Sequence, residues 1–230
     1  MSEAFPEMRV SRIGPADASR FGLAVLAQVG SQIAGVRRTG MARVVYDVSM
    51  SLDGFIAASG VTADEGLGIG GEVLHDWYMA EEKIRERPIA EYYDLGAFIA
   101  GRRTYDNSIK WWGGEGHSSG PTIIVSHDMP AHVPGQGTYI FVDSLAIALD
   151  TARNAAGDKD IRVMGGDIAG QFLREGLLDE IAIHIAPVLF GTGLPLFGES
   201  PLQLGGHIRL TQIEATRTKA ATHLFYRVVK

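Results

Sequence analysis

Two glycine turns, each following a short strand-like segment, are the features of this sequence that indicate chemistry. In the first, residues 161–164 lead into Gly165 and Gly166, after which an apolar helical pattern begins. Adjacent glycines let the backbone turn sharply and approach a ligand, and the start of a helix presents unpaired N–H groups that attract anions. The turn therefore predicts a phosphate site, and an ordinary tight strand–helix connection is the alternative interpretation.

A second turn of this kind follows the apolar residues 97–100. There, Gly101 precedes Arg102 and Arg103 at the start of a predicted helix. Two cations at a helix N-terminus oppose the helix dipole, so this placement is unfavourable unless an anion binds between the guanidinium groups and the amides. Two such sites in one domain indicate a ligand that carries several phosphates.

The elements that must position these turns alternate between strands and helices. Residues 1–40 lack sustained periodicity and are predicted to form a loosely ordered N-terminal extension, so the domain is expected to span residues 41–230. Strands are predicted at 44–50, 97–100, 122–126, 138–142, 161–164, 180–188, 207–214 and 220–229, and helices at 72–83, 104–109, 144–156 and after 166. This order predicts an α/β fold with a mostly parallel central sheet and an antiparallel C-terminal hairpin.

Composition argues against several other classes of protein. The chain has 230 residues, of which 46% are hydrophobic, a formal net charge of −6 and no cysteine. The acidic balance argues against a general nucleic-acid binder, and the lack of cysteine excludes thiolate chemistry and fits a reducing compartment. No apolar run approaches the roughly 20 residues that span a bilayer. We therefore expect a cytoplasmic protein that binds a small-molecule substrate and neither nucleic acid nor membrane.

Two apparent motifs of other sites lack the neighbouring elements that these motifs require. Residues 66–71 match the dinucleotide pattern G-x-G-x-x-G but follow no strand, and residues 116–120 match the nucleophile elbow G-x-S-x-G but precede a strand instead of a helix. The seven histidines show no compact ligand spacing, so no metal site is predicted.

Five segments, taken in order, resemble the dihydrofolate reductase-like superfamily. They are residues 49–57 (S-M-S-L-D-G-F-I-A), 101–105 (G-R-R-T-Y), 121–126 (P-T-I-I-V-S), 163–166 (V-M-G-G) and 178–197. The resemblance covers about residues 41–229 and is closest to the reductase domain of the bifunctional deaminase–reductase of riboflavin biosynthesis. It implies a three-layer α/β/α fold and an NADPH-dependent reductase.

The resemblance also assigns roles along these segments. The adenosine 2′-phosphate of NADPH is assigned to the turn that begins at Gly101, with Arg102, Arg103, Thr104 and Ser126. The diphosphate is assigned to Gly165, Gly166, Asp167, Ile168 and Ala169. The nicotinamide is assigned to Ser49 and Ile56, and the substrate to Val48 and Met50, with Asp53 nearby. Apart from the resemblance, Trp77 is a candidate to stack on a flat substrate ring, and anchoring of a loop or an interface is the alternative. Because a planar guanidinium pairs bidentately with a phosphate dianion, the arginines are expected to favour NADPH over NADH. Asp167 fits only if its carboxylate points away from the diphosphate or caps the helix.

Hydride transfer also needs a proton, and two residues are candidates for handling it. Asp53 lies in an Asp-Gly turn, where it either donates a proton or only bonds nearby backbone N–H groups. His184 is the polar side chain on the strand face opposite three isoleucines, where it either transfers a proton or only packs. Folate reductases carry a carboxylate on the helix after the first strand, but the residues around Asp76 do not match their pattern, which argues against dihydrofolate.

These observations predict an NADPH-dependent reductase of a small heterocyclic substrate, resembling the reductase that acts on 5-amino-6-(5-phosphoribosylamino)uracil. A dihydrofolate or pterin reductase and a non-catalytic NADPH-binding protein are the alternatives. A homodimer is expected from the family and from the long terminal strands, whose edges need covering.

Overall fold

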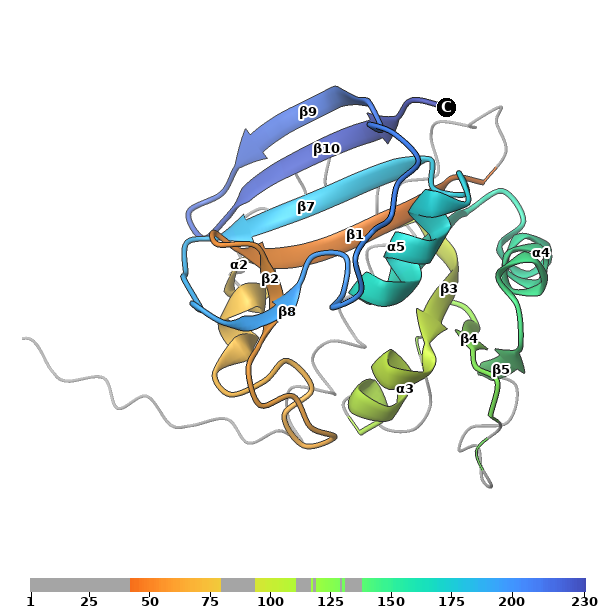
Figure 1. The fold of residues 1–230 in the computed structure, drawn as a ribbon, viewed down its shortest axis with the longest axis horizontal. Coiled ribbons are helices and arrows are strands. Elements are labelled where there is room, and N and C mark those ends of the chain that lie inside the picture. Colours follow the sequence, from red (N-terminus) through yellow and green to blue (C-terminus); the bar gives the residue numbers. More distant parts are fainter. Residues whose placement is uncertain (1–41, 80–93, 111–116, 118, 129, 131–137) are drawn as a thin grey trace, which may run out of the picture.

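The central sheet has eight strands, and each corresponds to a strand predicted from the sequence. The computed structural model describes residues 42–79, 94–110, 117, 119–128, 130 and 138–230 (Figure 1), so the predicted N-terminal extension lies outside these ranges. Along the sheet the order is β5 (Tyr139–Val142), β4 (Thr122–Val125), β3 (Leu95–Gly101), β6 (Asp160–Met164), β1 (Val44–Ser51), β7 (Glu180–Ala186), β10 (Thr222–Val228) and β9 (Leu210–Arg217). The strands from β5 to β7 pair in parallel, and β10 pairs antiparallel with both β7 and β9. The predicted α/β fold is confirmed.

Helices α4 (Leu145–Ala156) and α5 (Gly166–Arg174) cover one face of the sheet (Figure 1), here called the helix face. The hydroxyl of Ser144 accepts the N–H of Ile147 at 3.3 Å and so caps α4 at its predicted start. Ala148 and Ala152 bring α4 close to the sheet because a methyl group occupies little space. Phe172 of α5 is fully buried in the same cluster.

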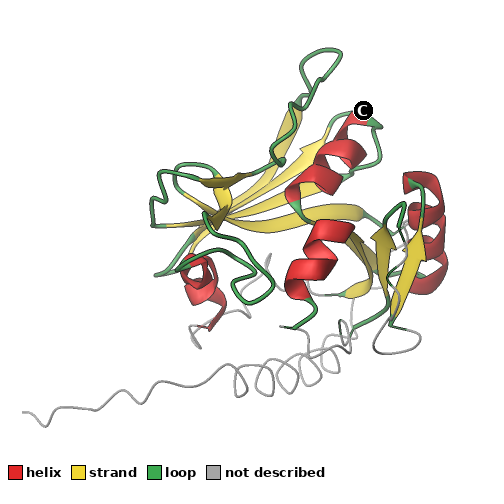
Figure 2. Cartoon of the chain, turned by 60° about the horizontal axis from the view of Figure 1, so that its bottom comes forward, coloured by secondary structure: helices red, strands yellow, loops and turns green. Residues whose placement is uncertain are grey.

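The 3₁₀ helix η1 (Gly71–His75) and helix α2 (Asp76–Met79) pack on the opposite face, which we call the histidine face (Figure 2). Trp77 of α2 contacts a cluster there that includes Val45 and Phe225. Because side chains alternate along a strand, β1 sends Val44 and Tyr46 to the helix face and its intervening residues to the histidine face.

Several element boundaries differ from the predictions. The single helix predicted at 72–83 is instead η1 followed by α2, and residues 80–83 lie outside the described ranges. Helix α3 (Arg102–Ser108) begins two residues earlier than predicted. The strand predicted at 207–214 is β9 at Leu210–Arg217, and a second sheet of β2 (Phe55–Ala58) with β8 (Gly193–Pro195) was missed.

Candidate functional site

The two predicted glycine turns lie side by side at one edge of the sheet. Strands β3 and β6 are parallel neighbours, so their carboxyl ends share an edge. The chain leaves β3 toward β4 and leaves β6 toward β7, in opposite directions along the sheet. Such a switch in direction opens a crevice outside the carboxyl ends of the strands, where ligands bind in open α/β sheets.

Contacts between the two turns confirm that they adjoin. Gly165 has a φ of 96°, and a Cβ atom placed on it would overlap Oγ1 of Thr104. A Cβ atom on Gly101 would lie 3.9 Å from the Cβ of Ile168. Glycine is therefore required at position 165 both by its backbone conformation and by the closeness of Thr104. We call Gly101, Arg102, Thr104, Ser126 and Gly165 the phosphate edge.

The start of α5 has an exposed side and a packed side. Its first N–H groups have no partner within the helix, which is a general property of helix N-termini. A Cβ atom on Gly166 would overlap the backbone nitrogen of Gly198, so this glycine lets α5 pack against the loop after β8. The carboxylate of Asp167 points at Gly198 and does not cap the helix, whose N-cap is Gly165. Asp167 therefore does not cap the helix, and its predicted place beside the diphosphate stays a prediction.

Arg102 and Ser126 meet at one backbone carbonyl. The Nη1 of Arg102 donates to the carbonyl oxygen of Asp128 at 2.8 Å, and the hydroxyl of Ser126 donates to the same oxygen at 2.7 Å. The Nε of Arg102 donates to the carboxylate of Asp106 at 2.9 Å. The structure thus brings together two residues that are 24 positions apart and were both assigned to the 2′-phosphate.

The arginines at the start of α3 have carboxylate partners at the surface. Arg103 pairs with Glu199 at 3.3 Å, with side chains that are 52% and 66% exposed, and Arg102 pairs with the partly exposed Asp106. Exposed ion pairs contribute about 0–1 kcal/mol, so a phosphate can displace these carboxylates at little cost. The donor set of two guanidinium groups, two hydroxyls and helix amides fits a phosphorylated dinucleotide.

A buried chain of polar side chains crosses the histidine face. His184 on β7 is 2% exposed, and its Nε2 lies 3.0 Å from Oδ1 of Asp47 on β1. Its Nδ1 lies 2.8 Å from Nδ1 of His223 on β10, and Nε2 of His223 lies 3.2 Å from Oγ1 of Thr218. Arg162 on β6 begins the chain: its Nη2 donates to the backbone carbonyl oxygen of Asp47 at 3.0 Å and forms an ion pair with Oδ1 of Asp47 at 3.5 Å. Four strands therefore contribute to one hydrogen-bonded chain.

The protonation states on this face follow from burial and from Arg162. Burial raises the pKa of Asp47, but Arg162 and His184 lower it more, and the pKa falls to about 2. Burial, together with His184, lowers the pKa of His223 to about 4. Burial and the Arg162 guanidinium also lower the pKa of His75 and of His117 to about 4. At neutral pH Asp47 is therefore ionised and His223 is neutral.

Trp77 and Ser49 cover this chain. The indole Nε1 of Trp77 donates to the hydroxyl of Ser49 at 2.9 Å, and its ring centroid lies 4.3 Å from that of His184. Trp77 is only 6% exposed. The structure therefore gives Trp77 a packing contact, and its predicted stacking on a substrate stays a prediction.

Asp53 holds a turn against a neighbouring loop. Its carboxylate accepts the hydroxyl of Ser51 at 2.6 Å and the backbone N–H groups of Phe190 and Gly191. The Ser51 hydrogen bond, followed by these N–H groups, lowers the pKa of Asp53. An ionised acceptor has no proton to give, so the geometry favours the turn role over the proton-donor role, which stays a prediction.

The remaining predicted contact residues lie on both sides of β1. Val48 packs into the cluster of the helix face, whereas Ser49 lies on the histidine face. Met50 is partly buried, and Ile56 on β2 is buried. The structure thus separates Val48 from Trp77, with which it was grouped as a substrate contact. Asp47 and His223 were missed, because both lie in strands that also carry other polar residues, and only the strand register brings them beside His184.

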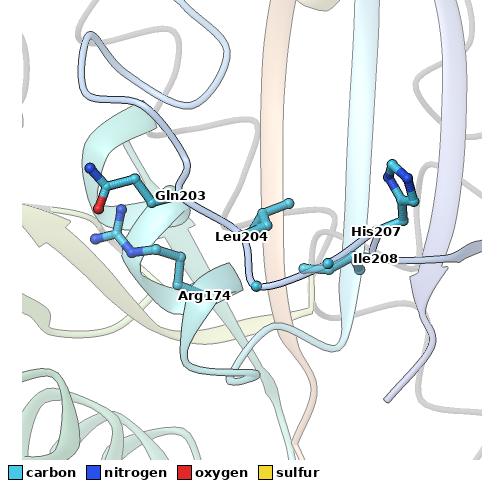
Figure 3. Close-up of a pocket in the computed structure, with 7 residues that line it drawn as sticks. Arg174, Gln203, Leu204, His207 and Ile208 are labelled. Atoms are coloured by element: carbon cyan, nitrogen blue, oxygen red, sulfur yellow. The ribbon is translucent and has the colours of Figure 1, made fainter.

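A surface cavity elsewhere involves none of the predicted site residues. It lies at the C-terminal end of α5 (Figure 3) and is lined by Arg174 and by residues 203–208. The phosphate edge lies at the other end of that helix. We therefore keep the crevice and the histidine face as the candidate site.

Comparison with known proteins agrees with this architecture. The RibD C-terminal domain family matches residues 42–224 of the chain. No curated protein matches the chain. None of the helices in the described ranges is long and apolar enough to cross a membrane.

Solved structures with the same fold extend the comparison. A putative riboflavin biosynthesis protein from Shewanella sp. PV-4 is 24% identical, with a TM-score of 0.62 over 83% of this chain and 100% of that chain. RibD from Acinetobacter baumannii is 16% identical, with a TM-score of 0.57 over 84% of this chain and 59% of that chain. Dihydrofolate reductase from Enterococcus faecalis, complexed with NADP(H), is 13% identical, with a TM-score of 0.53 over 85% of this chain and 100% of that chain. These similarities establish a dihydrofolate reductase-like fold.

Proposed function

The chain belongs to the RibD C-terminal domain family, the reductase branch of the dihydrofolate reductase-like superfamily, and from this premise we propose that it is an NADPH-dependent reductase of a small heterocyclic substrate. The proposed substrate class is that of 5-amino-6-(5-phosphoribosylamino)uracil. When bound, NADPH supplies a hydride to a polarised carbon of the substrate, and the protein orients the two and provides a proton.

The observation that carries this proposal is the contact between the two glycine turns. Thr104 lies directly against Gly165, so the N-terminus of α5 and the basic start of α3 adjoin. A dinucleotide diphosphate suits the amides of α5, and a further phosphate suits Arg102 and Ser126. Ser49, which we propose contacts the nicotinamide, is the register partner of His184, so a polar side chain adjoins the proposed position.

Thermal unfolding in the presence of NADPH or NADH tests the cofactor. A ligand that binds the native state at 100 times its Kd stabilises it by about 2.7 kcal/mol, so NADPH is expected to raise the melting temperature and NADH to raise it less. An equal response to both nucleotides would contradict the assignment of a 2′-phosphate site.

The variant Arg102→Ala tests the same site more sharply. Loss of a charge-assisted hydrogen bond to phosphate is expected to weaken NADPH binding by about tenfold or more, with NADH binding nearly unchanged. Arg153→Ala, at an exposed position on α4, is a matched control because it removes a surface cation far along the chain from the crevice. Calorimetric titration of both nucleotides measures these affinities.

NADPH oxidation, followed by absorbance, distinguishes the proposed substrate class from its competitors. Turnover with 5-amino-6-(5-phosphoribosylamino)uracil and not with dihydrofolate supports the proposal. Turnover with dihydrofolate alone would favour a folate or pterin reductase. NADPH binding without turnover of either would favour a non-catalytic NADPH-binding protein.

Self-association is a separate part of the proposal. Leu210 and Ile213 on the edge strand β9 are 45% and 40% exposed, and an uncovered edge strand is a site for pairing with another chain. We expect a homodimer in solution. Light scattering coupled to size-exclusion chromatography measures the mass, and a monomer at all concentrations would contradict this expectation.

A further inference from the structure

The residues of β8 and those directly after it connect two parts of the proposed cofactor site. We call residues 193–199 the β8 segment. Its first residues pair with β2, which carries Ile56, a residue assigned to the nicotinamide. Its last residues reach the start of α5, where the diphosphate is assigned, because a Cβ atom on Gly166 would overlap the backbone nitrogen of Gly198. The β8 segment is therefore placed to influence how the start of α5 lies.

Tyr46 on β1 holds the β8 segment from inside the core. Its side chain is fully buried, and its hydroxyl donates to the carbonyl oxygen of Leu196 at 2.6 Å. Its ring centroid lies 5.7 Å from that of Phe197. Burial raises the pKa of Tyr46 above its ordinary value, so the hydroxyl keeps its proton and stays a donor at neutral pH. One side chain of a central strand thus contacts two consecutive residues of the segment.

The carbonyl group that Tyr46 binds lies against the first residue of α5. A Cβ atom on Gly166 would come within 3.0 Å of that oxygen. One turn further along the helix, a Cβ atom on Gly170 would come within 3.2 Å of the carbonyl oxygen of Phe197. The β8 segment and the first turn of α5 are therefore in close backbone contact, and a shift of the segment must move this turn or leave a gap beside it.

The contacts at the outer side of the β8 segment are more exposed. The N–H of Leu196 donates to the carbonyl oxygen of Gly54 at 3.1 Å. Glu199 pairs with Arg103 through side chains that are more than half exposed, and an exposed ion pair contributes little to stability. The hydrogen bond from Tyr46 is buried, so water cannot replace it when it is lost. Removal of the Tyr46 hydroxyl is therefore expected to loosen the segment.

We propose that Tyr46 is a positioning residue for the cofactor: through the carbonyl group of Leu196 it holds the start of α5 where the helix amides can bind a dinucleotide diphosphate. This inference rests on the proposed reductase function. Because NADPH and NADH share the diphosphate, loss of this support weakens the binding of both by the same factor. Arg102 is assigned to the 2′-phosphate, which NADH lacks, so the two residues predict different patterns of nucleotide selectivity.

Calorimetric titration of Tyr46→Phe with NADPH and with NADH tests this role. The variant keeps the ring and removes the hydroxyl, and we expect both nucleotides to bind at least about fivefold more weakly, with the ratio of their affinities unchanged. Ile181→Val is the matched control, because it removes one buried methyl group from the same face and lowers stability to a comparable extent. Its affinities should equal those of the unaltered chain. Unchanged affinities in Tyr46→Phe, or a loss for NADPH alone, would overturn the proposal.

Hydrogen exchange of the ligand-free chain tests the support of α5 without any nucleotide. In the first turn of α5, the N–H of Ala169 donates to the carbonyl oxygen of Gly165 at 3.1 Å. In the first turn of α4, the N–H of Ala148 donates to that of Ser144 at 3.0 Å. We expect Tyr46→Phe to raise the exchange rate of Ala169 at least about fivefold relative to that of Ala148, and the control variant to leave this ratio unchanged. An unchanged ratio in Tyr46→Phe would show that the hydroxyl has no local effect on α5 and would overturn the proposal.

Gly198→Ala disturbs the same contact from the other side and serves as the second variant if Tyr46→Phe does not fold. Gly198 has a φ of 84°, and a Cβ atom on it would overlap the carboxylate of Asp167. We expect the same weakening of both nucleotides, and normal affinity for both would overturn the proposal. If the unaltered chain binds neither nucleotide, the proposed function and the cofactor role of Tyr46 fail together, whereas the exchange ratio still decides whether Tyr46 holds the start of α5.

Discussion

The phosphate edge and the histidine face hold their charges under opposite conditions. At the edge, Arg103 and Glu199 are more than half exposed, and their ion pair is long at 3.3 Å. On the histidine face, the side chains of Asp47 and His184 are 7% and 3% exposed and lie 3.0 Å apart. Water screens the first pair, so its two side chains separate at little cost in free energy. The second pair is buried, where the lower dielectric constant strengthens the interaction. The first region is thus suited to exchange one anion for another, and the second to keep its polar groups in one arrangement.

The largest effect that this comparison predicts is on folding stability at Asp47. Asp47→Ala leaves Arg162 and the Nε2–H of His184 without their carboxylate partner in a buried site. Removing one member of a buried ion pair costs about 3–5 kcal/mol, and the lower end is expected here because Arg162 is partly exposed. Urea unfolding of the variant and of the unaltered chain measures the difference. A loss below about 1 kcal/mol would mean that the buried Asp47 interactions contribute no more to stability than an exposed ion pair does.

The same contrast explains which parts of the site can be predicted from the sequence. The phosphate edge is encoded locally, because a strand, a glycine and a helix start occupy about ten consecutive residues. The chain on the histidine face joins residues that are 39 and 137 positions apart, and only strand pairing brings them together. His184 was found from alternation within its own strand, whereas its partners Asp47 and His223 required the register of β1 and β10.

Burial likewise explains which elements were placed correctly. Strands such as β1 and β3 are buried along most of their length, and their predicted positions agree with the structure within two residues. Strand β9 is exposed along almost its whole length, so it shows no contrast between a buried and an exposed face, and its prediction was displaced by three residues. Strands β2 and β8 have four and three residues and lie next to glycine turns, which is too short for a periodic signal.

The pH dependence of folding stability is expected to show an effect of intermediate size. The pKa values of His75, His117 and His223 are lowered from 6.5 to about 4 in the folded protein, so the unfolded chain binds more protons between these values. Stability is therefore lost as the pH falls from about 6.5 to 4. Because 1 kcal/mol shifts the melting temperature of a chain of this size by about 2–4 °C, a fall of about 5 °C or more is expected between pH 7.5 and 5.

A variant can assign part of this pH dependence to one side chain. His117 stacks on Phe98 with ring centroids 3.8 Å apart, and His117→Phe keeps a stacking ring but removes the titratable group. The decline in melting temperature toward low pH should then be shallower. His207→Gln, at an exposed position, should leave the decline as it is. Equal slopes in all three proteins would show that His117 has no part in the acid sensitivity.

The smallest effect is expected for Arg103→Ala at the phosphate edge. The side chain is 52% exposed and its partner Glu199 is 66% exposed, so removal of the cation should change the free energy of unfolding by less than about 0.5 kcal/mol. If Arg103 also contacts a phosphate of NADPH, the same variant should lower the thermal shift that NADPH produces. Glu199→Gln frees the guanidinium from its partner and should do the opposite, so the two variants move ligand binding in opposite directions while stability stays level. A large loss of stability in Arg103→Ala without NADPH would instead show that this arginine stabilises the fold. The proposed difference between the exposed phosphate edge and the buried histidine face would then not hold at this position.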